Sequence, residues 1–221
     1  MPANIEAFRS TIFQYGGLLK LDRFRLRFPP PPGMTDFEFA DPASDVQNAT
    51  RFMEFFCNTA DLPGVGVATR NIRRYGYGAF EKKPVFPIFN DVMLTFITDA
   101  GATNLQYFQQ WMASTVNYKF SSDINNSKSA LGYDVYEVTY KEEYAVDADL
   151  TLFDDADNPV YTVAMRDFFP CMIPETKLAW ETVNQFMTIV VMFCFTDMYF
   201  VRPEGLGGIG PNIGGPPTIG F

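Results

Sequence analysis

The sequence contains no histidine in its 221 residues. Histidine is the general base most often used near neutral pH and the commonest metal ligand in proteins. Its absence excludes catalysis by serine–histidine or cysteine–histidine pairs, and it excludes zinc sites of the H-E-x-x-H type. Catalysis by paired carboxylates stays open, so this absence argues against an enzyme without excluding one.

Cysteine and long apolar runs are also scarce. Cys57, Cys171 and Cys194 are far apart and form no C-x-x-C pair, so we expect buried free thiols and neither a metal site nor a cofactor. The most apolar stretch, 186–195, has about half of the roughly 20 residues that a membrane helix needs. Residues 1–10 carry no apolar signal core. We therefore predict no membrane insertion.

Aromatic residues, by contrast, are abundant. Phenylalanine occupies 23 positions and 47% of the chain is hydrophobic, which is too much for a disordered protein. Such large side chains must be buried, either within the subunit or against a neighbouring one. The composition therefore predicts a folded protein with an extensive core or interface.

Segments with the pattern of β-strands dominate the chain. In 23–28, polar and apolar residues alternate with the period of a half-buried strand, and the prolines of 29–32 end it because proline cannot donate to a strand ladder. In the extended region 65–80, Gly76 and Gly78 predict a bend or bulge. The same reasoning predicts further strands at 52–57, 91–98, 136–140, 160–165 and 187–201.

Two segments have helical periodicity instead. Apolar residues recur every three or four positions in 104–116, which predicts a helix packed on a sheet. A shorter amphipathic helix is expected at about 4–14, with Asn4 as its N-cap.

Together these segments predict a mainly β fold, an antiparallel β-sandwich or partial barrel with one packed helix. We expect a single β domain over residues 1–202, with an insertion at about 33–50. From 203 to 221 the chain is rich in glycine and proline and has no periodicity, so we expect an extended tail there.

The net charge of −9 is unevenly distributed. Between residues 134 and 157 there are nine acidic residues against one lysine, whereas 70–83 has five basic residues against Glu81 alone. Three interpretations of the acidic run stay open: a solvated hairpin, a calcium site, or one charged face of a subunit that stacks head to tail. The run lacks the EF-hand pattern, because no glycine stands at the sixth position and no glutamate at the twelfth.

Several motifs follow one another between residues 20 and 201. They are Leu62-Pro63-Gly64 after a strand, the basic-aromatic segment 73–76, the strand 90–96, the helix with Phe108 and Trp111, the run 168–174 and a closing strand at 187–199. Taken in this order and spacing, the motifs resemble the tail tube protein family of contractile-tailed phages, including the baseplate proteins that initiate the tube.

The resemblance implies a structural virion protein with no catalytic residues. It implies a β-sandwich subunit whose strands join those of its neighbours in a homo-oligomeric ring of six. Stacked rings would form the inner tube of the tail, with a β-barrel lumen through which phage DNA passes without specific binding. The implied partners are further copies, tail sheath proteins and baseplate proteins, and the implied location is the virion, after assembly in the host cytoplasm.

A conduit for DNA should not hold the phosphates, which basic side chains bind by releasing counterions. We therefore expect acidic residues to line the lumen and basic residues to lie between subunits. The candidate lumen residues are Glu137, Glu142, Glu143, Asp147 and Asp149, and the candidate inter-subunit residues are Arg70, Arg73, Arg74, Lys82 and Lys83.

Three alternatives to the repeated tube protein remain. The nearest is a baseplate tube initiator, which would form a single ring on which the tube polymerises. The second is the tube of a secretion system with the same architecture. The third is a hydrolase that uses two carboxylates of 134–157, which would need a concave pocket with carboxylates of split pKa.

Overall fold

The computed structural model describes residues 4–14, 17–34, 46–73, 76, 78–116, 138–180 and 185–201, the side chains of 46–50 excepted. In this part of the chain, no helix combines the length and the apolar character needed to span a membrane. The helices are α1 (Ile5–Gln14), α2 (Val46–Phe56), α3 (Thr103–Thr115) and α4 (Lys141–Tyr144). The strands are β1 (Phe24–Arg27), β2 (Cys57–Ala60), β3 (Val65–Ile72), β4 (Glu81–Phe89), β5 (Val92–Ile97), β6 (Val146–Phe153), β7 (Pro159–Met172), β8 (Thr188–Cys194) and β9 (Asp197–Val201).

Seven strands form one antiparallel sheet in the order β1-β6-β7-β8-β5-β2, with β9 also paired to β7. The long strand β7 connects two layers, because its first part pairs with β6 and β9 and its last part pairs with β8. Side chains from both layers and from α2 and α3 meet in one core. The predicted mainly β, antiparallel fold is confirmed, and the sheet of the single chain is open, since its end strands β1 and β2 do not pair with each other.

Alternating side chains explain why these strands pack. In β5, Val92, Leu94 and Phe96 are buried while the residues between them are more exposed, as predicted for 91–98. β6 and β8 alternate in the same way, with Val146, Ala148, Leu150, Ile189, Val191 and Phe193 buried. A two-residue period buries one face of each strand against the helices and the opposite layer.

The predicted helix at 104–116 is α3, and its apolar face fills the core. At the start of α3, the two carboxylate oxygens of Asp99 accept hydrogen bonds from Thr103, one from its backbone N–H and one from its hydroxyl, at 2.7 Å each. Trp111 and Phe108 are fully buried. The Trp111 indole N–H donates to the Tyr144 carbonyl oxygen at 2.7 Å, which ties α3 to α4.

The prediction of a strand at 52–57 is wrong. Residues 52–56 lie in α2, and Cys57 is the first residue of β2. The apolar residues of this segment have a helical spacing: Phe52 and Phe56 stack with ring centroids 3.9 Å apart, and Met53 is fully buried. α2 contacts β1, β2 and β5, so it lies between the two ends of the open sheet. The domain thus has a second packed helix besides α3.

Other expected boundaries also change. The strand predicted at 187–201 is divided into β8 and β9, and Thr196 between them donates its N–H to the Arg166 carbonyl oxygen at 3.0 Å. Of the strand predicted at 136–140, Val138 forms only an isolated bridge with Val116, and residues 136 and 137 lie outside the described residues. So do most of the predicted insertion and the tail 203–221.

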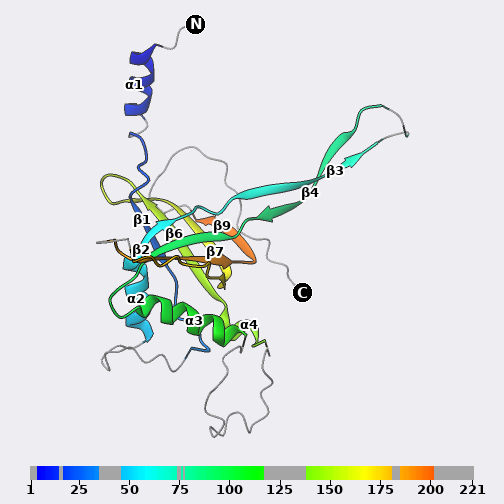
Figure 1. The fold of residues 1–221 in the computed structure, drawn as a ribbon. Coiled ribbons are helices and arrows are strands. Elements are labelled where there is room, and N and C mark those ends of the chain that lie inside the picture. The colour runs from blue at the N-terminus through cyan, green and yellow to red at the C-terminus, as the bar shows by residue number, and fades with distance from the viewer. Residues whose placement is uncertain are drawn as a thin grey trace, which may run out of the picture.

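The helix predicted at 4–14 is α1, with Asn4 as its cap: the Asn4 side-chain oxygen accepts the Glu6 N–H at 3.0 Å. This helix stands apart from the sheet (Figure 1). Its apolar residues Ile5, Phe8 and Phe13 are therefore largely exposed.

Candidate functional site

β3 and β4 form a two-stranded arm that projects from the body of the subunit (Figure 1). The two strands pair with each other from Val65 opposite Phe89 to Ile72 opposite Glu81. Neither strand joins the seven-stranded sheet. Beyond Phe89 at the end of β4, which packs against the core, the arm therefore depends little on the subunit's own interior.

The arm carries several large apolar side chains that are exposed to solvent in the single subunit. A two-stranded hairpin is marginally stable in water without a third layer to cover it. Exposed large apolar side chains concentrated on one projecting element are typical of a surface that binds another molecule. The large apolar residues exposed along the arm are Val65, Val67, Val85, Phe86 and Ile88, each between 44% and 59% accessible.

A hydrogen bond fixes the root of the arm, and two glycines form its tip. At the root, the Asn90 N–H donates to the Gly64 carbonyl oxygen at 3.2 Å. At the tip, Gly76 and Gly78 have φ values of 72° and 92°, which only glycine adopts at little cost, as the predicted bend required. The guanidinium of Arg73 lies 4.2 Å from the centre of the Phe80 ring.

β4 carries two prolines, Pro84 and Pro87, opposite Thr69 and Val67. Proline offers no N–H to another strand, so both positions limit uncontrolled strand addition along the arm. The pairing also shifts register after Ala68, which twists the ribbon. Specific contacts through side chains are therefore favoured over open-ended β-aggregation.

The structure brings together three of the basic residues predicted from the sequence, Arg70, Lys82 and Lys83. Arg70 lies directly opposite Lys83, and Lys82 lies opposite Asn71, so the outer half of the arm is positive. Like charges directly opposite each other destabilise a strand pair. An acidic surface of another molecule would relieve that repulsion. Arg74 lies outside the described residues.

The predicted acidic residues are divided between two elements. Glu142 and Glu143 lie on α4, whereas Asp147 and Asp149 lie on the exposed face of β6. Glu137 lies outside the described residues.

The face of β6 that carries Asp147 and Asp149 also borders a groove beside α2, which Arg25, Arg27 and Glu54 help to line. Asp149 is exposed, yet partial desolvation beside the groove raises its pKa, an effect that Arg27 opposes and Asp147 reinforces. Burial likewise raises the pKa of Glu54, against the nearby arginines. The groove therefore mixes both signs of charge.

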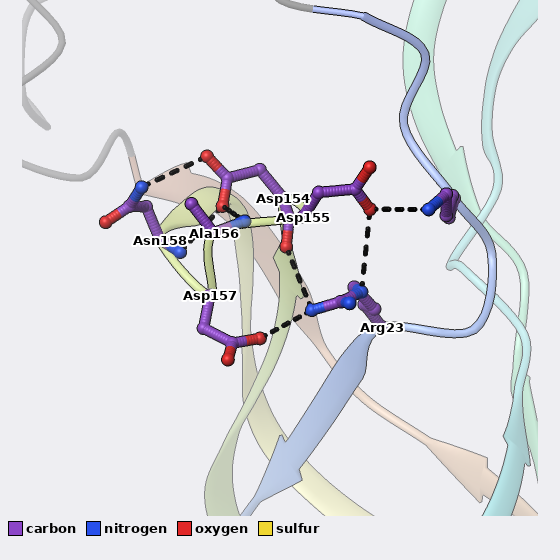
Figure 2. Close-up of polar contacts among 7 residues, drawn as sticks. Arg23, Asp154, Asp155, Ala156, Asp157 and Asn158 are labelled. Carbon is purple, nitrogen blue, oxygen red and sulfur yellow. Dashed lines mark hydrogen bonds and ion pairs between the residues drawn. The ribbon is translucent and has the colours of Figure 1, made fainter.

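The last part of the acidic run forms the β6–β7 turn, shown in Figure 2. Asp155 pairs with Lys20 at 2.9 Å, and Asp157 pairs with Arg23 at 2.7 Å. Asp154 accepts the N–H groups of Ala156 and Asn158 at 2.8 Å each, so it closes the turn. These carboxylates form ion pairs and hydrogen bonds within the subunit. Such contacts match a solvated hairpin and give no support to a calcium site.

Asp154 provides a pH-dependent test of this turn. Hydrogen bonds from the backbone and side chain of Asn158, with a smaller one from Ala156, lower the pKa of Asp154. Because the folded-state pKa is depressed, the turn's stabilisation is present above the unfolded-state pKa and is lost as the pH falls through the folded value. Asn158→Ala removes the side-chain hydrogen bond and keeps the backbone one, so we expect it to raise the Asp154 pKa part of the way towards its ordinary value, as measured by NMR titration of the carboxyl carbon. An unchanged pKa in this variant would contradict the turn geometry.

The cysteines are half-buried free thiols. Burial raises the pKa of Cys57 to about 12, and burial also raises the pKa of Cys171 and Cys194. The Sγ atoms of Cys171 and Cys194 lie close to a carboxylate oxygen of Asp91, and among the described residues this is the one group of three such ligands that converges. Sequence reasoning misses this cluster, because spacing along the chain gives no signal for it.

Comparison with known proteins gives one family. A sequence profile described as "Phage tail tube protein" matches residues 20–201. No curated protein sequence matches the chain. The matched region contains the whole sheet and the arm, and it leaves out α1.

A solved baseplate structure has a similar fold. A chain of the anti-feeding prophage baseplate, determined by cryo-EM with sixfold symmetrisation, has a TM-score of 0.55 at 11% identity, over 86% of this chain and 99% of that chain. A chain of the sheath–tube complex of an extracellular contractile injection system has a TM-score of 0.48 at 12% identity, over 87% of this chain and 97% of that chain. At this identity the baseplate chain shows a shared fold.

Proposed function

The chain belongs to the phage tail tube protein family, and we propose that its copies close into rings of six that stack into the inner tube of a contractile tail. The rings surround a lumen through which DNA passes without specific binding. The outer wall meets the tail sheath, and the end of the tube meets the baseplate. The role is structural and requires no catalytic residue.

The observation that carries this proposal is the β3–β4 arm. Its exposed apolar residues have no partner surface on the described part of the subunit, and they require one for the arm to be stable. In a ring, each arm lies on the next copy and each copy receives one arm. Such a contact joins two different surfaces, and it closes without leaving free arms when the rotation between copies completes a circle.

The open sheet supports the same arrangement. β1, β2 and β9 each pair with one strand of the described chain, so each has a free edge. Free edges invite further strand pairing, and closure into a barrel uses them up. Neighbouring copies would supply the missing strands.

The charges support both the contact and the lumen. The positive half of the arm, with Arg70, Arg73, Lys82 and Lys83, would meet an acidic surface of a neighbour, as would Arg74. In this proposal the lumen is lined by acidic side chains, which repel phosphates instead of binding them. The proposed lumen residues are Glu137, Glu142, Glu143, Asp147 and Asp149.

Cryo-EM of the purified protein, alone and with baseplates, tests the proposal. We expect rings and stacked tubes in which each β3–β4 arm contacts a neighbouring copy and the acidic residues face the lumen. Copies that remain separate even on a baseplate, with their sheet edges and arms touching no other copy, would contradict it. Acidic residues found only on the outer wall would contradict the lumen assignment while leaving the ring intact.

A second candidate is a baseplate tube initiator, which forms one ring at the start of the tube. Helix α1, which lies before the matched residues 20–201, favours it, because a repeated tube subunit needs no further helix standing outside the body. Copy number distinguishes the two functions: quantitative mass spectrometry of intact particles would find one ring of an initiator and many rings of a tube protein.

A further inference from the structure

Three metal-binding side chains converge where β7 and β8 meet the start of β5. The Sγ atoms of Cys171 and Cys194 and a carboxylate oxygen of Asp91 all lie within 4.8 Å of one another. Both thiols are half-buried, whereas Asp91 is exposed. The cluster therefore combines a partly shielded pair of sulfur ligands with an oxygen ligand that solvent and ions can reach.

A β-bulge explains how the two cysteines meet. Cys194 lies opposite Phe169 in the β7–β8 pairing. In a regular ladder Cys171 would therefore be a diagonal neighbour of Cys194, with the two Cα atoms about 7–8 Å apart. The register shifts between Pro170 and Met172, which makes Cys171 the extra residue of a bulge. A bulge redirects the side chain that it inserts. Here the Cys171 Sγ lies within 4.8 Å of the Cys194 Sγ, and the Cys171 thiol donates to the Met192 carbonyl oxygen at 3.4 Å.

The spacing fits a tetrahedral ion. Zinc binds thiolate sulfur at about 2.3 Å and carboxylate oxygen at about 2.0–2.2 Å, which places neighbouring ligand atoms about 3.6–3.8 Å apart. The three atoms are within 4.8 Å already, so small side-chain rotations close the difference. We propose that Cys171, Cys194 and Asp91 bind one zinc ion, with water in the fourth position.

The ligand set selects the metal. Calcium and magnesium bind oxygen ligands almost exclusively, so a pair of thiolates disfavours both. Copper(I) prefers soft sulfur ligands, and the carboxylate of Asp91 disfavours it. Zinc accepts sulfur and oxygen together, and it stays divalent without redox chemistry.

The position of the site shows which elements a bound ion would join. Asp91 follows Asn90, whose N–H closes the root of the β3–β4 arm on Gly64. Phe89 at the end of β4 also contacts Phe195, with ring centroids 6.0 Å apart. Bound zinc would therefore fix the root of the arm to β7 and β8. The site lies within one copy, so this inference goes beyond ring assembly and does not rest on it.

Metal titration of the reduced, metal-free full chain tests the proposal. We expect one zinc ion per chain by isothermal titration calorimetry, with protons released because thiols bind zinc as thiolates. Cobalt(II) should give thiolate-to-metal charge-transfer absorption and intensified visible bands. Cys171→Ser and Cys194→Ser should each weaken zinc binding by more than about 100-fold, since even second-shell changes cost 10–100-fold.

Two further variants make the result decisive. Cys57→Ser is the matched control, because Cys57 lies outside the cluster, and it should leave zinc binding unchanged. Asp91→Asn tests an exposed ligand whose replacement does not disturb the core, and it should weaken binding and remove the carboxylate from the site. Absence of stoichiometric binding, an equal loss in Cys57→Ser, or a stable Cys171–Cys194 disulfide with no zinc bound after reduction would overturn the proposal.

Discussion

Replacing Phe86 in β4 with aspartate is expected to prevent assembly while leaving the subunit folded. Phe86 is 57% exposed and lies opposite Ala68 in the arm, so the change removes little core packing. In the proposed ring the same side chain is buried against the next copy. Truncation of a central aromatic contact costs about 2 kcal/mol or more, and a buried carboxylate adds a desolvation penalty. The concentration needed for assembly should therefore rise at least about 30-fold.

The measurement is sedimentation velocity together with negative-stain microscopy over a range of protein concentrations. Circular dichroism and thermal unfolding of the dissociated variant check that it folds as the parent does. Phe13→Asp is a matched control, because Phe13 is also an exposed phenylalanine but lies in α1, outside the matched residues 20–201. Normal tubes from Phe86→Asp would show that the arm is not an assembly contact. An equal loss in both variants would show that exposed aromatic residues matter without any special role for the arm.

The body of the fold could be predicted where one physical signal dominates a segment. In 91–98 and 104–116 the apolar residues follow a two-residue and a three-to-four-residue period, and both segments have the predicted structure. In 52–57 the closely spaced aromatic residues mimic a buried strand. Their true period becomes visible only when the segment is extended back to Val46, which reveals a strongly amphipathic helix.

Two strands escape sequence reasoning for different reasons. In β4, Pro84 and Pro87 are typical strand breakers, and they are tolerated because the arm pairs on one side only. In β6, the aspartates dominate the sequence, yet Val146, Ala148 and Leu150 alternate with them and are buried. A half-exposed strand with a charged outer face thus resembles a solvated loop.

The candidate site was partly predictable from charge alone. Arg70, Lys82 and Lys83 lie close together because they belong to a single hairpin, and a hairpin keeps sequence neighbours near each other in space. The cluster of Cys171, Cys194 and Asp91 depends on the register of two strand pairs and on one bulge. Such long-range register is set by the packing of the whole core, so spacing along the chain cannot reveal it.

The two tryptophans of the chain provide a matched test of the subunit's own core. Trp111 is fully buried, packs against Phe28 and Phe193, and donates its indole N–H to Tyr144. Trp111→Ala leaves a large cavity and an unpaired carbonyl oxygen, and loss of a buried tryptophan costs about 3–5 kcal/mol. Since small domains are stable by only about 5–15 kcal/mol, much of the subunit's stability should be lost.

Trp180→Ala is the matched control, because Trp180 is fully exposed. The same substitution there should change the free energy of unfolding of the dissociated subunit by less than about 0.5 kcal/mol. Urea denaturation followed by far-ultraviolet circular dichroism measures both variants without relying on tryptophan fluorescence. Comparable losses in the two would contradict the core described above. A large loss confined to Trp111→Ala means that each copy builds its core from its own residues, so that neighbours are needed to cover the arm and sheet edges but not to fill the interior.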